Sequence, residues 1–204
     1  MKKTYFLAVN AILIALIFIL GFTPLGLIPL GFIDLTILHI PVIIGTIILG
    51  LPSGLILGLS FGTVSFLNLL RAGAGLAPTL FAASPLAAVV MVFVPRLLVP
   101  AFTYLTYRAI ARGREKYVPA VPFAAVAGSL TNTVFFLGFM YLGYLFSGLD
   151  LHALAENLGV AGLSFLGILL AIATGGGGGE AVAAALISAP VAAAVWKVKR
   201  NGKA

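Results

Sequence analysis

The sequence predicts an all-α integral membrane protein, a six-transmembrane-helix bundle with both termini in the cytoplasm. Of its residues, 62% are apolar and only 8% are charged. An ordinary soluble domain carries about a quarter charged residues, so this chain cannot cover a water-facing surface. A length of 204 residues accommodates about six membrane helices of ~20 residues with short loops. We therefore expect one membrane domain over residues 1–204.

Positive charge gathers at three places along the chain. Ten of the twelve Lys and Arg residues lie at Lys2–Lys3, within 108–116 and within 197–203. The positive-inside bias places these segments in the cytoplasm, which gives the two termini the same side. Their position favours contact with anionic lipid headgroups over binding of nucleic acid. The chain has no cysteine, which excludes disulfides and Cys-ligated metals.

The helices follow the apolar runs. We expect them at about residues 4–20, 35–51, 54–70, 85–107, 121–146 and 180–198, with an outer apolar segment at 160–173. The first run is interpreted as a retained helix, because no small-x-small cleavage site follows it. Residues 51–54, 71–84 and 174–179 are rich in Gly or Pro, so we expect a turn, an outer loop and a flexible break there.

Small residues form stripes on two of the expected helices. Gly54, Gly58 and Gly62 make two overlapping GxxxG units, a pattern that indicates close packing of this helix against a neighbour. Ala11 and Ala15 put a second small-residue stripe on the first helix. Spacing alone leaves open whether its partner is another helix of this chain or another protein.

Polar side chains within the apolar runs converge on the outer half of the predicted bundle. They are His39, Asn68, Arg96, Thr131, Asn132 and Glu180. An arginine inside a membrane costs at least about 2.5 kcal/mol and normally has a partner or a task. Because helical side chains lean toward the N-terminus of their helix, Arg96 and Glu180 should both reach toward the outside. We expect a binding pocket open to that side.

The same polar residues could instead have purely structural roles. The side chain of Arg96 could pair with Glu180. It could also bond to the backbone carbonyls of Met91 and Arg96, which Pro95 and Pro100 leave without an N–H donor. His39 could serve as a hydrogen-bonding group at a helix start. Thr131 and Asn132 could join helices, and the aromatic residues at 135–144 could form an interfacial belt or packing.

The residues give no sign of catalysis. No nucleophile–base arrangement and no metal-ligand spacing is present, and the glycines at 175–179 lack the Lys-Ser/Thr of a phosphate-binding loop. We therefore predict a protein that is not an enzyme and needs no cofactor.

Several segments resemble one family. They are Val9–Ala15 (VNAILIA), Asp34–Gly45 (DLTILHIPVIIG), Ser84-Pro-Leu, Val94-Pro-Arg96 and Ser129–Thr133 (SLTNT). Together they resemble the substrate-binding (S) components of energy-coupling-factor (ECF) vitamin transporters, and among these the pantothenate-specific branch. The family commonly has Asn-Gly near the start of its last helix, where this chain has Gly175–Gly179 before Glu180.

The resemblance implies a six-helix bundle that captures a vitamin outside the cell with high affinity. It also implies docking to a transmembrane coupling protein and two cytoplasmic ATPases, followed by release of the vitamin inside. The family's Ala-x-x-x-Ala coupling surface falls on Ala11 and Ala15. The implied location is the cytoplasmic membrane of a prokaryotic cell.

Residues and resemblance together give the working hypothesis. Arg96 offers a bidentate match to a carboxylate, Asn68, Thr131 and Asn132 would fix hydroxyl or amide groups, and aromatic side chains would cover the apolar portion. Pantothenate has this set of groups. The alternatives are a structural or assembly subunit of a membrane complex, and a self-sufficient secondary transporter.

Overall fold

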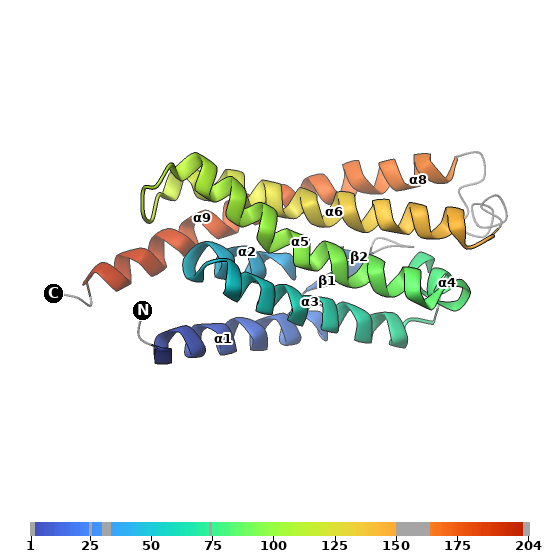
Figure 1. The fold of residues 1–204 in the computed structure, drawn as a ribbon, viewed down its shortest axis with the longest axis horizontal. Helices are drawn as coiled ribbons and strands as arrows, with labels where there is room; N and C mark the ends of the chain where they lie inside the picture. Colours follow the sequence, from blue (N-terminus) through green and yellow to red (C-terminus); the bar gives the residue numbers. More distant parts are fainter. Residues whose placement is uncertain (1–2, 25, 30–33, 74, 150–163, 202–204) are drawn as a thin grey trace.

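The fold is a bundle of helices aligned along one long axis (Figure 1). The computed structural model describes residues 3–24, 26–29, 34–73, 75–149 and 164–201. In chain order the elements are α1 (Lys3–Gly21), β1 (Leu27–Pro29), β2 (Asp34–Thr36), α2 (His39–Leu49), α3 (Leu51–Arg71), α4 (Leu76–Ala83), α5 (Pro85–Ala111), η1 (Val118–Ala120), α6 (Val121–Phe146), α8 (Phe165–Ile172), η2 (Ala173–Gly177) and α9 (Gly178–Asn201).

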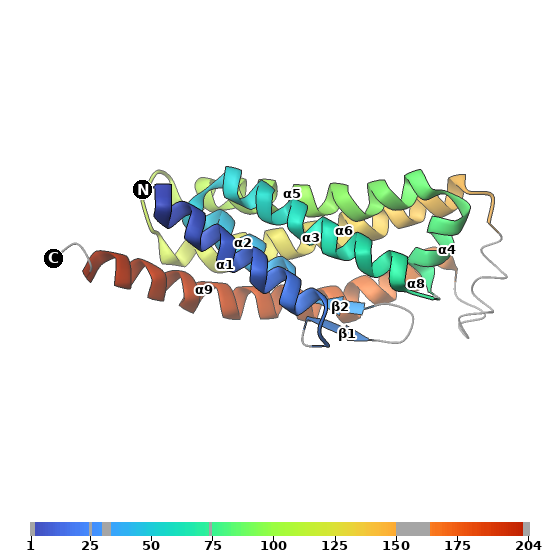
Figure 2. The same ribbon diagram turned by 90° about the horizontal axis from the view of Figure 1, so that it is seen from below.

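The predicted helical membrane class is confirmed. Within the described residues, five helical segments are long and apolar enough to cross a membrane: α1, α3, α5, η1 with α6, and α8 through α9. The α2 helix is apolar but shorter, with 11 residues. Two views at right angles place the N- and C-termini and the turn between α5 and α6 at the same end of the bundle (Figures 1 and 2).

A small antiparallel hairpin, which the sequence analysis did not predict, precedes α2. Leu27 pairs with Thr36 and Pro29 with Asp34. The expected helix at 35–51 is therefore too long at its start, and α2 begins at His39. Because strand pairing depends on residues from two segments, the apolar run alone does not reveal where the helix begins.

The turn between α2 and α3 lies at Gly50, so the predicted turn at residues 51–54 is wrong. Gly50 has φ = 95°, a left-handed conformation that glycine adopts without steric cost. Pro52 lies in the first turn of α3, where a missing N–H leaves no helical hydrogen bond unmade. Likewise, residues 76–83 of the expected outer loop form the α4 helix.

The glycine-rich stretch near the C-terminus is helical, so the predicted break at 174–179 is also wrong. The α8 helix continues through one π-helical turn, η2, directly into α9. Of the expected outer segment 160–173, residues 165–172 are α8 and residues 160–163 lie outside the described residues. Glycine disfavours a helix by about 1 kcal/mol per residue, a local preference that packing against neighbouring helices overrides.

Close packing of α3 against α5 confirms the prediction from the GxxxG pattern. A Cβ atom added at Gly62 would lie 2.7 Å from the Phe93 ring, and one at Gly54 would lie 2.6 Å from Pro100 Cβ. One at Gly58 would collide with the backbone carbonyl oxygen of Arg96. That carbonyl has no N–H donor four residues later, because residue 100 is proline. The three glycines thus fix the position of the α5 segment that carries Arg96.

Replacing Gly58 with alanine should force α3 away from α5. We expect the Gly58→Ala protein to be destabilised by about 1–3 kcal/mol, the usual cost of overpacking, which a thermal unfolding curve in detergent would show as a lower midpoint. Gly138→Ala is the matched control, because nothing lies within 4 Å of a Cβ at that exposed position in α6. Equal midpoints for the two variants would contradict the proposed tight contact.

Candidate functional site

The candidate site is built around a buried arginine in the middle of α5. Arg96 has only 6% of its surface exposed. Its Nη1 atom donates a hydrogen bond to the carbonyl oxygen of Met91 at 3.3 Å. That carbonyl is the one left without a helical donor by Pro95. The structure therefore supports, for Met91, the open interpretation in which Arg96 bonds to a proline-freed carbonyl.

Two phenylalanine rings lie against the guanidinium group. The Arg96 Cζ atom is 5.0 Å from the ring centroid of Phe61 on α3 and 4.5 Å from that of Phe136 on α6. Both distances are in the range of cation–π attraction, which strengthens where water is excluded. The Nε atom is buried and has no hydrogen-bond partner among the described residues. The rings therefore stabilise the cation, while the Nε–H group of the same side chain has no acceptor.

Glu180 supplies a buried carboxylate near this cation. Its side chain is 6% exposed, and its Oε1 atom accepts a hydrogen bond from the backbone N–H of Thr36 at 2.6 Å. Glu180 thus connects the start of α9 to the β1–β2 hairpin.

His39 is fully buried at the first position of α2. Neither of its ring nitrogens has a hydrogen-bond partner among the described residues. The structure therefore buries three of the predicted residues, His39, Arg96 and Glu180, which come from helices far apart in the sequence.

Asn132 and Thr131 lie on α6 beside this cluster. Asn132 is one helical turn before Phe136, which places the two on one face of the helix, and its Oδ1 atom is buried without a partner among the described residues. The Thr131 hydroxyl donates to the Ala127 carbonyl within the same helix at 2.7 Å. An unpartnered acceptor at Asn132 fits either a ligand or an interhelical role.

Asn68 has a structural partner elsewhere. Its Nδ2 atom donates to the Gly21 carbonyl at 2.8 Å, which joins the C-terminal end of α3 to the C-terminal end of α1. Arg71, one turn further along, lies 5.5 Å from the Phe22 ring centroid. Within the described part of the chain, no hydrogen bond joins Asn68 to Arg96, His39 or Glu180, and its role in ligand binding stays a prediction.

Sequence reasoning missed several contributors to this region. Phe61 lies against the Arg96 guanidinium, and the backbone N–H of Thr36 donates to Glu180. Phe61 belongs to an apolar run and Thr36 contributes only its backbone, so neither residue type indicates the contact. Asn10 also went unremarked, although it is polar within the apolar run of α1. Its Nδ2 atom donates to the Ser53 hydroxyl oxygen at 2.8 Å and joins α1 to α3. A polar side chain within an apolar run is the sequence signal that could have identified Asn10 as a contact between helices.

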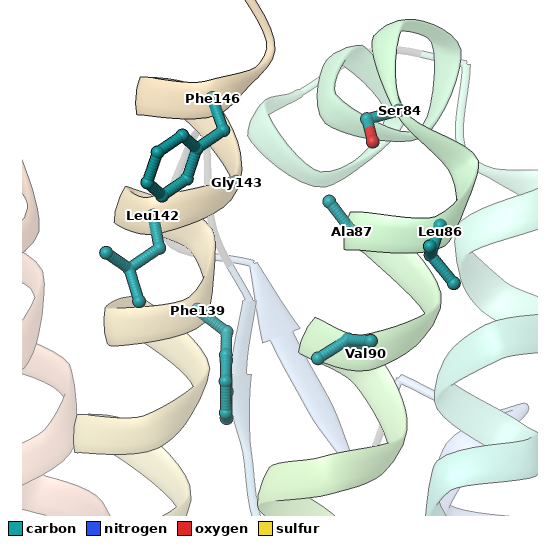
Figure 3. Close-up of a pocket in the computed structure, with 8 residues that line it drawn as sticks. All are labelled: Ser84, Leu86, Ala87, Val90, Phe139, Leu142, Gly143 and Phe146. Atoms are coloured by element: carbon teal, nitrogen blue, oxygen red, sulfur yellow. The ribbon is translucent and has the colours of Figure 1, made fainter.

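A separate groove lies between α5 and α6 (Figure 3). Its volume is about 300 Å³, and it is lined by Ser84, Ala87, Val90, Phe139, Gly143 and Phe146 among others. None of the lining residues is charged, and none belongs to the predicted polar site. This groove therefore offers no group that would recognise a charged ligand.

The small-residue stripe of α1 faces outward. Ala11 and Ala15 are both exposed, as are the neighbouring Leu7 and Ile12, at 66% and 67%. Figure 2 shows α1 at the outside of the bundle. The stripe is thus available to a partner instead of being covered by another helix of the chain.

Comparison with known proteins identifies the family. The chain matches the family described as ECF transporter, substrate-specific component, over residues 5–198. It belongs to this family. The resemblance inferred from the sequence is confirmed, and the family is one of transporter components, not of enzymes.

One relative has a stated substrate. The chain is 38% identical over 112 residues to the pantothenic acid transporter PanT of Lactococcus lactis subsp. cremoris (strain MG1363). The aligned part covers 50% of this chain and 53% of the relative, so the match spans about half the length of each.

The glycine stretch before Glu180 provides a test of how the carboxylate is positioned. A Cβ at Gly177 would lie 2.7 Å from Thr133 Cγ2, whereas nothing lies within 4 Å of a Cβ at Gly178. Gly177→Ala should displace η2 and the following Glu180, and so weaken the bond to the Thr36 N–H. Hydrogen exchange at the Thr36 amide should become faster in Gly177→Ala and stay unchanged in Gly178→Ala. Unchanged exchange in both variants would show that η2 does not position Glu180.

Proposed function

We propose that this chain is the high-affinity substrate-binding subunit of an ECF-type vitamin uptake transporter and that its substrate is pantothenate. Membership of the substrate-specific component family supports the general role. The 38% identity to a pantothenic acid transporter supports the choice of vitamin. The buried arginine of α5 is the observation that carries the proposal, because a cation held inside a membrane protein fits an anionic substrate.

The Arg96 guanidinium is the proposed site of the substrate carboxylate. The Cζ atom lies over the rings of Phe61 and Phe136, so an incoming acceptor would meet the N–H edge of the guanidinium. Nε has no partner among the described residues. A carboxylate on this edge would form the two parallel N–H···O bonds that arginine makes best.

The remaining groups of pantothenate, an amide and two hydroxyls, need polar partners. In the proposal these are His39, Asn68, Thr131 and Asn132. The buried free atoms of His39 and Asn132 support this assignment, since buried polar atoms in native proteins usually have partners. The phenylalanine rings beside Arg96 would cover the apolar methyl groups of the substrate.

The proposed topology has six membrane crossings in a single domain, residues 1–204. They are the five long apolar segments and the shorter α2. Basic residues near both termini and in the turn between α5 and α6 share one end of the bundle (Figure 1). By the positive-inside bias this end is cytoplasmic, and the membrane is the cytoplasmic membrane of a prokaryotic cell.

Transport requires partners, because the chain has no nucleotide-binding motif. We propose that it docks to a transmembrane coupling protein that carries two cytoplasmic ATPases. The exposed stripe of Ala11 and Ala15 on α1 supports this, since small side chains let the backbones of two helices approach closely.

A titration of the purified subunit tests the substrate. Pantothenate should bind with submicromolar affinity in calorimetry, and other water-soluble vitamins should not compete. Arg96→Ala should abolish binding while the protein remains folded and monodisperse, because a carboxylate in the site would lose its cation. The control is Arg71→Ala, an exposed arginine at the end of α3. Retained binding by Arg96→Ala, or loss of folding instead of binding, would favour a structural arginine.

A second experiment tests the docking surface. The double substitution Ala11→Leu and Ala15→Leu should prevent copurification of the ATPases but leave pantothenate binding by the isolated subunit unchanged. Bulky side chains hold a partner helix at a distance, whereas the site around Arg96 is on other helices. Ala194→Leu, at an exposed position of α9, is the control. Copurification at the wild-type level would exclude this stripe as the docking surface.

A further inference from the structure

The first helix is held against the bundle unevenly along its length. The buried residues of α1 are Asn10, Ile17 and Gly21. Two of these three lie near the C-terminal end of the helix, so Asn10 is the one buried residue of the segment 3–16. The same segment carries the exposed stripe of Ala11 and Ala15. How Asn10 is bound therefore decides how this part of α1 lies on the bundle.

The amide of Asn10 connects α1 to α3. Its Nδ2 atom donates one hydrogen bond to the Ser53 hydroxyl oxygen and one to the Phe6 carbonyl oxygen, each at 2.8 Å. Ser53 is fully buried in the first turn of α3, which begins directly after the turn at Gly50. The amide thus has one bond to its own helix and one bond to the start of the neighbouring helix.

An amide at this position is not what burial alone would favour. The Oδ1 atom of Asn10 is buried without a hydrogen-bond partner among the described residues, and an unpartnered buried acceptor costs free energy. A leucine of similar size would avoid this cost in apolar surroundings. What the amide adds is direction, as a single buried asparagine does when it fixes the register of two packed helices.

Apolar burial does not fix the rotation of α1 about its own axis. The exposed side of the helix carries Leu7 and Ile12, which are as apolar as the buried Ile17. Lipid tails are as apolar as leucine, so a turn of the helix would exchange one apolar face for another at little cost. The same turn would move the Asn10 amide away from Ser53 toward lipid, where no hydrogen-bond partner is available.

The bond to Ser53 also sets the direction of the alanine stripe. At 3.6 residues per turn, Ala11 and Ala15 lie roughly 100° and 140° around the helix from Asn10. Both alanines therefore point away from α3 when Asn10 faces it, and both are exposed. Figure 2 shows α1 at the outside of the bundle, where this face can meet another protein.

We propose that Asn10 is a positioning residue for docking, because its bond to Ser53 turns Ala11 and Ala15 outward toward a helix of the coupling protein. The inference rests on the proposed function, which supplies the partner for this face. It is independent of substrate capture, since neither Asn10 nor Ser53 belongs to the residues assigned to pantothenate.

The docking affinity of the detergent-purified full chain for the coupling protein with its two ATPases tests this role. Asn10→Leu should weaken docking about three- to twentyfold, the factor that corresponds to one interhelical hydrogen bond in a membrane, and should leave the affinity for pantothenate unchanged. Ser53→Ala should act in the same way. The double variant should dock no more weakly than Asn10→Leu, because both substitutions remove the same bond.

Ser60→Ala is the matched control on α3. Its hydroxyl donates to the Ile56 carbonyl of the same helix at 3.0 Å, so it makes no contact that holds α1. Docking and pantothenate binding should both stay at the level of the unsubstituted protein.

Spin labels measure the rotation of α1 in the subunit alone. The chain has no cysteine, so Ala15→Cys and Ile14→Cys each give a single labelling position. Ala15 is exposed, whereas Ile14 is half-buried and packs against the core. In bilayers, dissolved oxygen should reach the label at position 15 far more readily than the label at position 14. Asn10→Leu should reduce this difference, and Ser60→Ala should not.

Three results would overturn the inference. They are docking of Asn10→Leu at the unsubstituted level, an unchanged difference between the two labels, and a loss of pantothenate binding in parallel with docking, which is the effect of a general structural residue. If Asn10→Leu fails to fold, Ser53→Ala decides by the same measurements. If Ala11→Leu with Ala15→Leu leaves docking intact, the proposed docking surface fails and the inference fails with it. Intact docking of Asn10→Leu alone overturns only the inference.

Discussion

The burial of the Arg96 cation is the constraint on which the rest of the site depends. A guanidinium with 6% of its surface exposed needs compensation from every side, because the membrane interior supplies none. The chain provides a carbonyl freed by Pro95 and two aromatic rings. These come from α3, α5 and α6, so the charge can be held only when the helices are assembled.

Close helix packing makes this assembly possible. Gly58 on α3 lies directly against the carbonyl of Arg96, so the helix that supplies Phe61 approaches α5 at the level of the cation. In a membrane, helix association depends on packing and hydrogen bonds, since lipid tails are as apolar as leucine. Pro95 weakens the regular hydrogen bonding of α5 and at the same time supplies the acceptor that Arg96 uses. The two prolines thus act at different carbonyls: Pro95 frees the one that accepts from Arg96, and Pro100 frees the one that packs against Gly58.

The sequence predicted the parts of this arrangement that follow from local patterns. The α6 boundaries follow from apolar length, and the close packing of the α3 glycines follows from GxxxG spacing, although this spacing does not identify α5 as the neighbour. Proline chemistry gave the Met91 carbonyl as one of the possible partners of Arg96. Other contacts depend on tertiary structure. The bond from the Thr36 N–H to Glu180 joins residues 144 positions apart, and no local pattern indicates it. The helix through 173–177 also contradicts local glycine preference.

The contact between Glu180 and Thr36 joins the last helix to the β1–β2 hairpin. Thr36 closes this hairpin by pairing with Leu27, and its backbone N–H donates to the buried Glu180 carboxylate. A buried carboxylate needs such donors, because burial without a hydrogen-bond partner costs several kcal/mol. A ligand group that displaced Glu180 from this bond would therefore also have to separate α9 from the hairpin.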